Sequence, residues 1–148
     1  MNVEKVIKTD RKIPLKRRTI IHLMLIDHKI NETIAHALKP FEVSVQQFNV
    51  LRILRGQKGK PANLSTINER MVTKRSNTTR LVDKLLLKGY VDRKICPSNR
   101  RKIEITITDH GMARLEKMDR AMQKAEDEVL MNLSDENLEQ LNVLFDKF

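Results

Sequence analysis

The sequence predicts a mostly α-helical protein: a winged helix-turn-helix with long N- and C-terminal dimerisation helices. Three observations lead to this fold class. The 148 residues include only four Gly and four Pro, so long helices can form wherever the apolar spacing supports them. Two short helical segments precede a stretch of alternating apolar residues, which is the order of a winged domain. Longer amphipathic segments flank this domain on both sides.

The composition favours a folded, basic protein. Hydrophobic residues make up 40% of the chain and charged residues 32%, which is unlike a disordered segment. No apolar run approaches the ~20 residues of a membrane helix, and residues 1–18 are charged rather than secretory, so we expect a cytoplasmic protein without membrane association. The lone Cys96 and four scattered His predict no disulfide framework, metal site or cofactor.

Charge is unevenly distributed along the chain. The net charges of residues 1–18, 19–51, 52–102 and 103–148 are +5, −1, +12 and −6, which add to the total of +10. A strongly basic central segment beside an acidic C-terminal segment suggests a module that binds a polyanion and is carried on a separate scaffold. We therefore expect the central segment to bind phosphate groups.

The first long helix is predicted over residues 15–38. It follows a basic arm, residues 1–14, and stops before Pro40 because the residue before a proline is disfavoured in a helix. Its apolar residues recur at intervals of three and four. They are Ile20, Leu23, Ile26, Ile30, Ile34 and Leu38.

Two shorter helices follow, each with a recognisable start. Ser44 and Gln47 form a capping box for a helix that extends to about Gln57. Asn63 is the expected cap of the next, shorter helix. The residues expected to be buried in these two helices are Phe48, Leu51, Leu54, Leu64, Ile67 and Met71.

A third helix and a β-hairpin complete the predicted winged domain. Thr73 is the expected N-cap of a helix that ends at Lys88, with Gly89 at its C-terminal cap. Its predicted buried stripe is Thr78, Leu81, Val82 and Leu85. Two strands are predicted over residues 90–96 and 101–108, joined by a turn at 97–100.

Two helices are predicted after the hairpin. One begins at about Asp109, and the other begins at Ser134, which is followed by acidic residues in the first turn. We expect residues 15–40 and 109–148 to form a helical dimerisation region and residues 41–108 to form the winged domain. The apolar stripes of the first and last helices exceed what a small winged domain can cover, so they predict an obligate homodimer.

The polar residues at the start of the third winged-domain helix suit the major groove of double-stranded DNA. Arg, Lys, Asn, Ser and Thr side chains can contact base edges or phosphates there. Cations at the hairpin tip suit an adjacent minor groove. The predicted DNA-binding residues are Lys74, Arg75, Ser76, Asn77, Thr78, Thr79, Arg80, Lys84, Arg100, Arg101 and Lys102.

Three groups of residues share their spacing with a known family. The group ahead of the helix-turn-helix is Leu38, Ser44, Gln47, Phe48, Leu51 and Leu54. The second group lies in the third winged-domain helix, which would be the DNA-recognition helix, and in the first strand. Its members are Ser76, Thr79, Arg80, Leu81, Val82, Leu85, Gly89, Tyr90, Val91 and Arg93. The group in and after the wing is Arg100, Arg101, Thr108 and Gly111. With these residues, positions 15–148 resemble transcriptional regulators of the MarR (multiple antibiotic resistance regulator) family.

The resemblance implies a regulator rather than an enzyme: a homodimeric repressor that binds an inverted repeat. It further implies a small apolar or aromatic effector, bound where the long helices meet the winged domain. The residues expected around this effector are His22, Ile26, Phe48, Met112 and Leu115. The chain departs from the family pattern at Glu42, where a Gly is common, at Asn68, where a small Ala is favoured, and at Asn99, which replaces an Asp.

A different function also fits the basic, helical composition. A ligand-independent architectural protein would bind any duplex with a steep salt dependence and bend it, whereas a repressor would prefer one sequence. RNA binding is less well supported, because one Tyr and four Phe offer few platforms for stacking bases. A Gly-rich phosphate loop and a nucleophile elbow are absent from the sequence, so it does not support catalysis.

Overall fold

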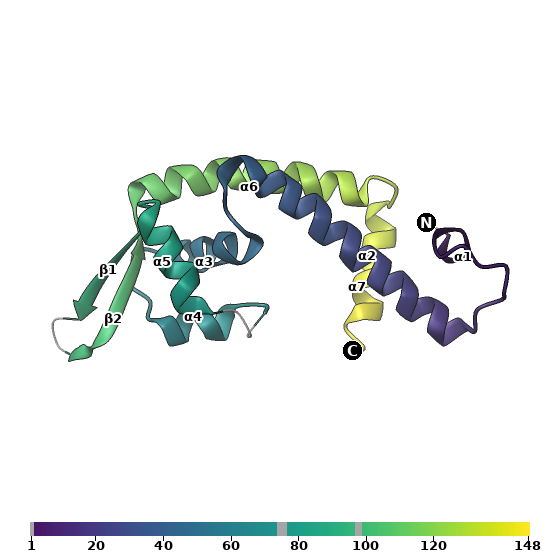
Figure 1. Cartoon of the computed structure of the whole chain (residues 1–148), viewed down its shortest axis with the longest axis horizontal. Helices are drawn as coiled ribbons and strands as arrows, with labels where there is room; N and C mark the ends of the chain where they lie inside the picture. Colours follow the sequence, from purple (N-terminus) through teal and green to yellow (C-terminus); the bar gives the residue numbers. More distant parts are fainter. Residues whose placement is uncertain (1, 74–76, 97–98) are drawn as a thin grey trace. The chain divides into compact units, whose positions relative to one another are not determined.

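The structure is a computed structural model that describes residues 2–73, 77–96 and 99–148. Figure 1 shows its helices and its two-stranded sheet along the chain. The elements are α1 (Val3–Val6), α2 (Leu15–Leu38), the 3-10 helix η1 (Lys39–Phe41), α3 (Val45–Gly56), α4 (Leu64–Arg70), α5 (Thr78–Leu87), β1 (Val91–Cys96), β2 (Asn99–Ile107), α6 (Asp109–Leu130) and α7 (Asp135–Phe145). This order confirms the predicted fold class, a mostly helical chain with a winged helix-turn-helix.

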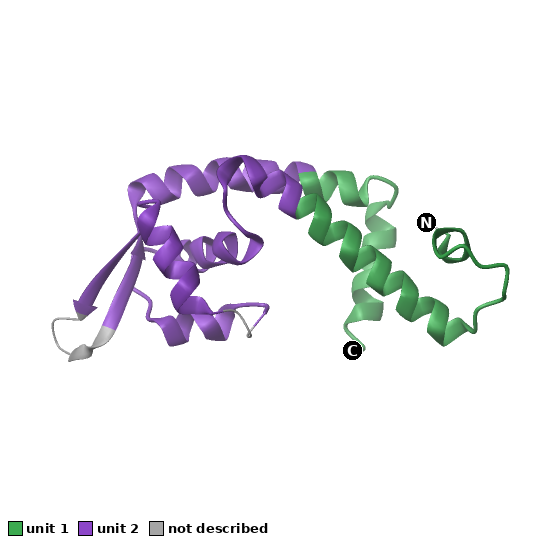
Figure 2. Ribbon diagram, in the orientation of Figure 1, with its two compact units in different colours: residues 1–34, 125–148 green, residues 35–124 purple. Residues whose placement is uncertain are grey.

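The chain divides into two compact units, coloured separately in Figure 2. Unit 1 contains residues 1–34 and 125–148, and unit 2 contains residues 35–124. The division falls within the long helices α2 and α6 rather than at their winged-domain ends. The reason is burial: Leu38 at the end of α2, and Leu115 and Met118 in α6, have 0% exposure and belong to unit 2.

The N-terminal caps of two helices confirm the sequence predictions. Ser44 Oγ accepts a hydrogen bond from the Gln47 N–H at 3.2 Å, and Gln47 Oε1 accepts one from the Ser44 N–H at 2.9 Å. This capping box begins α3. Asn63 Oδ1 accepts a hydrogen bond from the Thr66 N–H at 2.8 Å and begins α4.

The predicted start of α5 is wrong. The helix begins at Thr78, where Asn77 and not Thr73 is the N-cap. Asn77 Oδ1 accepts a hydrogen bond from the Arg80 N–H at 3.1 Å. Asn and Thr are both suitable caps, and the residue closer to the helix takes that place. The predicted C-terminal signal is confirmed, because Gly89 has a positive φ of 66°, which glycine adopts without steric cost.

The sheet and the helices of unit 2 enclose one core. β1 pairs antiparallel with β2, with Val91 opposite Ile107, and the register shifts between Ile95 and Cys96. Ala62 joins the edge of this sheet through two backbone hydrogen bonds with Ile105, of 2.9 and 2.7 Å. The large, fully buried side chains of this core include Leu38, Phe48, Leu51, Ile67, Leu85, Ile105, Leu115 and Met118.

Unit 1 consists of the N-terminal arm with α1, most of α2, the last turns of α6, and α7. Many of its apolar side chains face solvent in the single chain. The exposed large ones include Leu15, Ile20, Met24, Ile26, Met131, Val143, Leu144 and Phe145. Within the described residues, no helix is both long enough and apolar enough to cross a membrane.

Candidate nucleic-acid interface

One face of α5 is packed inside unit 2, which contains the helix-turn-helix and the wing and is called the winged unit below. The Thr78 side chain is buried, and its hydroxyl donates a hydrogen bond of 3.3 Å to Asn68 Oδ1 on α4. Val82 and Leu85 on the same helix have 0% exposure. These contacts orient α5 relative to α4, so the helix can present its other side to a ligand without changing its packing.

The opposite face of α5 presents Thr79, Arg80 and Lys84 to solvent. An ion pair between Asp83 Oδ1 and Arg93 Nη1, 2.8 Å long, connects this helix to β1. Both side chains of the pair are exposed, so the pair contributes little stability. It nevertheless links the orientation of α5 to that of the wing.

A hollow of about 430 Å³ with both polar and apolar lining lies beside this face. Its lining residues come from the N-terminal turn of α3 and from α5: Ser44, Gln46, Gln47, Asn77, Arg80, Leu81 and Lys84. The N-terminus of a helix carries a partial positive charge. Together with the Arg80 and Lys84 side chains, it makes this hollow electropositive and suited to a phosphate group.

The structure separates the predicted DNA-binding residues into groups. Thr79, Arg80 and Lys84 are exposed, whereas Thr78 is buried and Asn77 is engaged as the helix cap. Thr78 is therefore a packing residue in this conformation, because its hydroxyl already binds Asn68. Lys74, Arg75 and Ser76 lie outside the described residues. Arg100, Arg101 and Lys102 belong to β2, but their side chains lie outside the described part of the structure.

A junction between the wing and α6 was not singled out as a structural site by sequence reasoning. The Thr108 hydroxyl donates a hydrogen bond to the Gly89 carbonyl oxygen at 2.7 Å and accepts one from the Gly111 N–H at 2.9 Å. Arg114 Nε donates a hydrogen bond to the Tyr90 hydroxyl at 3.2 Å. The only signal in the sequence was the spacing of Thr108 and Gly111. These hydrogen bonds join the start of α6 to the segment between α5 and β1.

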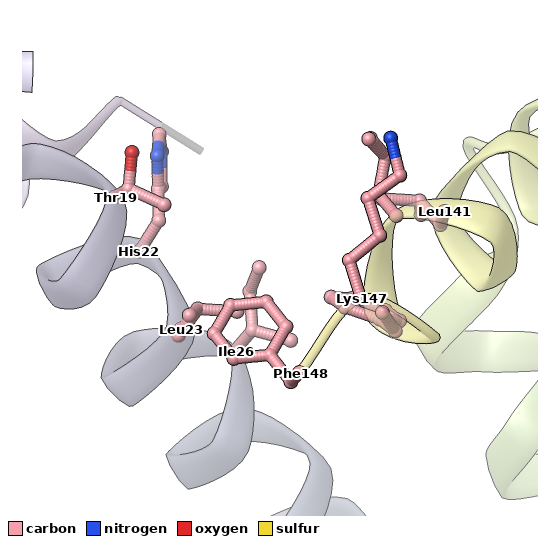
Figure 3. Close-up of a pocket in the computed structure, with 9 residues that line it drawn as sticks. Thr19, His22, Leu23, Ile26, Leu141, Lys147 and Phe148 are labelled. Atoms are coloured by element: carbon pink, nitrogen blue, oxygen red, sulfur yellow. The ribbon is translucent and has the colours of Figure 1, made fainter. Parts of the chain in front are cut away.

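An apolar cavity of about 700 Å³ lies between α2 and α7 in unit 1 (Figure 3). Its lining residues are Thr19, His22, Leu23, Ile26, Leu141, Leu144, Phe145, Lys147 and Phe148. Of the five residues predicted around an effector, this cavity contains His22 and Ile26. Phe48 and Leu115 are instead buried in the core of unit 2, where Met112 is half-buried.

Comparisons with known proteins agree with this geometry. The MarR family model matches residues 43–103, from just before α3 into β2. The HTH-type transcriptional regulator PapX of Escherichia coli is 24% identical over 150 residues, which cover 98% of this chain and 92% of PapX.

Solved structures match over nearly the whole chain. A MarR transcription factor from Planctomyces limnophilus is 27% identical, with a TM-score of 0.73 and coverage of 93% of this chain and 100% of that one. A mutant MarR from Escherichia coli complexed with operator DNA is 24% identical, with a TM-score of 0.75 and coverage of 99% and 98%. The winged part of this chain thus matches the MarR family of transcriptional regulators, and nearly the whole chain is similar to proteins of that family.

Proposed function

We propose that this regulator is a cytoplasmic homodimeric repressor that binds an inverted repeat in double-stranded DNA through α5. The observation that carries the proposal is the two-sided character of this helix. Thr78 holds one side on α4, and Thr79, Arg80 and Lys84 lie exposed on the other. The operator complex of the similar Escherichia coli protein supports the same use of the winged unit here.

The exposed residues have different proposed roles. Arg80 and Lys84 line the electropositive hollow beside the N-terminus of α3, so we assign them to phosphate contacts, which provide affinity for any sequence. Thr79 is assigned to a base edge. The sequence places Lys74, Arg75 and Ser76 next to this face and Arg100, Arg101 and Lys102 on the wing, and we include them as DNA contacts on that basis.

The exposed apolar side chains of unit 1 support a homodimer. Ile20 and Met24 on α2 are 54% and 66% exposed, and Val143 on α7 is 61% exposed. A second copy would cover such a surface, and a two-fold dimer would present two copies of α5 to one duplex. Two α5 helices would then meet half-sites about 10 bp apart, one turn of the double helix.

We also propose that a small apolar or aromatic effector regulates DNA binding. The cavity between α2 and α7 supports this proposal through its volume of about 700 Å³ and its Leu, Ile and Phe lining, which match an apolar guest. An effector changes DNA occupancy only if it binds the DNA-free arrangement more tightly than the DNA-bound one. Filling the cavity with Ile26→Trp should therefore abolish release by effective compounds and leave DNA binding in their absence unchanged.

Selection from a random duplex library tests the proposed function. A repressor should enrich one inverted repeat, and the repeat should occur near regulated promoters, whose transcription should rise when the protein is removed. An architectural protein would enrich no motif and would bend every duplex it binds. Failure to enrich a motif, combined with a steep salt dependence on all duplexes, would replace the repressor with this second candidate.

A further inference from the structure

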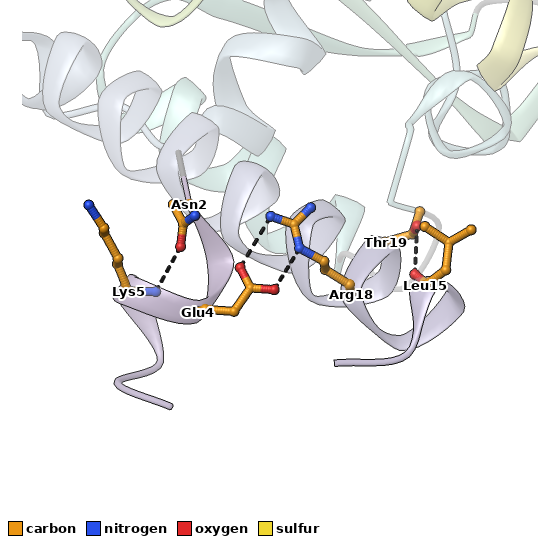
Figure 4. Close-up of polar contacts among 6 residues, drawn as sticks. All are labelled: Asn2, Glu4, Lys5, Leu15, Arg18 and Thr19. Carbon is orange, nitrogen blue, oxygen red and sulfur yellow. Dashed lines mark hydrogen bonds and ion pairs between the residues drawn. The ribbon is translucent and has the colours of Figure 1, made fainter. Parts of the chain in front are cut away.

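The N-terminal arm is fixed on its own α2 by one of its faces. Val3 has 0% exposure. The Glu4 carboxylate accepts hydrogen bonds of 2.7 and 3.2 Å from Arg18 Nε and Nη2 on α2 (Figure 4). The Glu4 carbonyl also accepts a hydrogen bond of 3.1 Å from the Thr9 N–H. These contacts hold α1 against the start of α2, so the arm has a defined orientation.

The other face of the arm is apolar, cationic and exposed. Val6 and Ile7 are 49% and 43% exposed, and Lys5 and Lys8 on either side of them are exposed as well. Figure 4 shows Lys5 extending away from the Glu4–Arg18 pair. Residues 1–18 contain seven Lys and Arg against two acids, and one of those acids, Glu4, is paired with Arg18. This face therefore combines unburied apolar area with an excess of positive charge.

Helix α7 carries a surface with the complementary chemistry. A groove of about 500 Å³ runs along it, lined by Glu136, Glu139, Gln140, Val143 and Leu144. Val143 and Leu144 are 61% and 54% exposed. α7 contains three acidic residues and no basic one. The groove thus has an apolar floor beside acidic side chains, and Leu144 is the residue that it shares with the cavity between α2 and α7.

We propose that the N-terminal arm of one protomer clasps the α7 groove of a second copy. Val6 and Ile7 would cover Val143 and Leu144, while Lys5 and Lys8 would face Glu136 and Glu139. Apolar contact would supply the affinity, and the charges would select the partner and its orientation. This inference rests on the proposed homodimer and adds how its two chains recognise each other.

The clasp is assigned to a second copy rather than to the same chain. The ion pair of Glu4 with Arg18 already commits the arm to its own α2, and the Val3 side chain is already buried within the single chain. Across the described residues, no hydrogen bond or ion pair joins residues 2–14 to α7 of the same chain. The exposed face of the arm and the groove of α7 therefore remain open in the single chain, and two copies related by a two-fold axis would close both.

Two charge-reversed variants test the clasp. The first, K5E/K8E, gives the arm the charge of the groove, and the second, E136K/E139K, gives the groove the charge of the arm. Dimer dissociation constants of the full-length chains would be measured by sedimentation at low salt, after circular dichroism has confirmed folding. Each variant alone should dimerise about tenfold more weakly than the parent, because like charges face each other in both clasps.

An equimolar mixture of the two variants gives the decisive result. Each clasp of the mixed dimer joins opposite charges again, so its dissociation constant should return to the parent's value. A clasp within one chain would not recover, because each chain keeps its like-charged pair. The control E69K/E116K makes the same change in net charge as E136K/E139K, but on α4 and on the part of α6 that belongs to unit 2, and it should dimerise like the parent.

The outcomes separate the clasp from the rest of the proposal. Recovery in the mixture supports the clasp. A parent dimer combined with no recovery overturns the clasp and leaves the homodimer in place, as does an equal loss in the control. A parent chain that sediments as a monomer overturns the proposed homodimer and, with it, the clasp.

Discussion

The backbone carbonyl oxygen of Tyr90 occupies the space beside Gly111 that a side chain would need. A Cβ atom at Gly111 would lie 2.0 Å from this oxygen and 2.8 Å from the carbonyl carbon. Such a distance is incompatible with any residue other than glycine unless the backbone moves. Gly111, in the first turn of α6, is thereby in direct contact with the backbone of Tyr90, which lies between α5 and β1. The two segments meet at a position that tolerates no side chain.

Gly111→Ala should therefore destabilise the protein. We expect a loss of about 1–3 kcal/mol in the free energy of unfolding, because the added methyl group overpacks a rigid contact. Urea denaturation would measure it. Gly56→Ala is the matched control: its Cβ would have no neighbour within 4 Å, so its stability should be unchanged or slightly higher. Equal stability of the two variants would show that the contact yields easily.

Thr78 should act on stability, in contrast to its exposed neighbour Thr79. Thr78→Val keeps the side-chain shape but removes the hydroxyl that donates to Asn68, and we expect a loss of about 1 kcal/mol. Thr79→Val changes an exposed side chain and should alter stability by less than about 0.5 kcal/mol. Thermal unfolding of both variants would check the contrast. Similar losses would mean that the hydrogen bond to Asn68 contributes nothing.

Arg80→Gln and Lys84→Gln should weaken binding to every duplex. If each side chain neutralises one phosphate per protomer, each substitution lowers the slope of log affinity against log salt by about 1.8 in a dimer, at about 0.9 per contact. Fluorescence anisotropy at several salt concentrations would measure this slope. Lys124→Gln, an exposed cation on α6, provides the control for net charge. An unchanged slope for Arg80→Gln would remove that residue from the phosphate contacts.

The arm should detach from α2 at acidic pH. The hydrogen bond from Arg18, followed by one from the backbone of Glu4 itself, holds the pKa of the Glu4 carboxyl below its ordinary value of 4.5. The pair therefore contributes fully above pH 4.5 and is lost as the pH falls through the lowered pKa. Amide NMR signals of residues 3–7 should shift over this acidic range. Glu4→Gln should show the shifted signals at pH 7, and identical spectra for parent and variant would contradict the anchoring role.

Local capping signals explain why most of the fold was predictable. Ser44, Asn63 and Ser134 each begin a helix with a side-chain hydrogen bond within three residues, and such bonds depend only on nearby sequence. Helix α1 was missed because it has four residues and is supported by a contact with Arg18, fourteen positions away. Helix propensity depends on the local sequence, so it gives no information on a contact between residues fourteen positions apart.

The candidate site was predictable in part for the same reason. Arg80 and Lys84 follow from the charge and position of α5, but the separation of Thr78 from Thr79 depends on the rotation of the helix against Asn68. Glu42 illustrates the same limit. The comparison with the family pattern shows that a Gly is common at this position, but the sequence alone does not give the reason. The structure shows why glycine suits the position, since Glu42 has a left-handed φ of 52° and forms a 3.1 Å ion pair with Lys88.

In the proposed complex, the exposed face of α5 contacts base edges in the major groove. This contact is tested by comparing the sequences that the parent and Thr79→Ala enrich from one random duplex library. We expect an inverted repeat for the parent, and for the variant a relaxed or altered preference at the same position of both half-sites. An identical motif for both proteins, with unchanged affinity, would contradict the placement of this face of α5 in the groove.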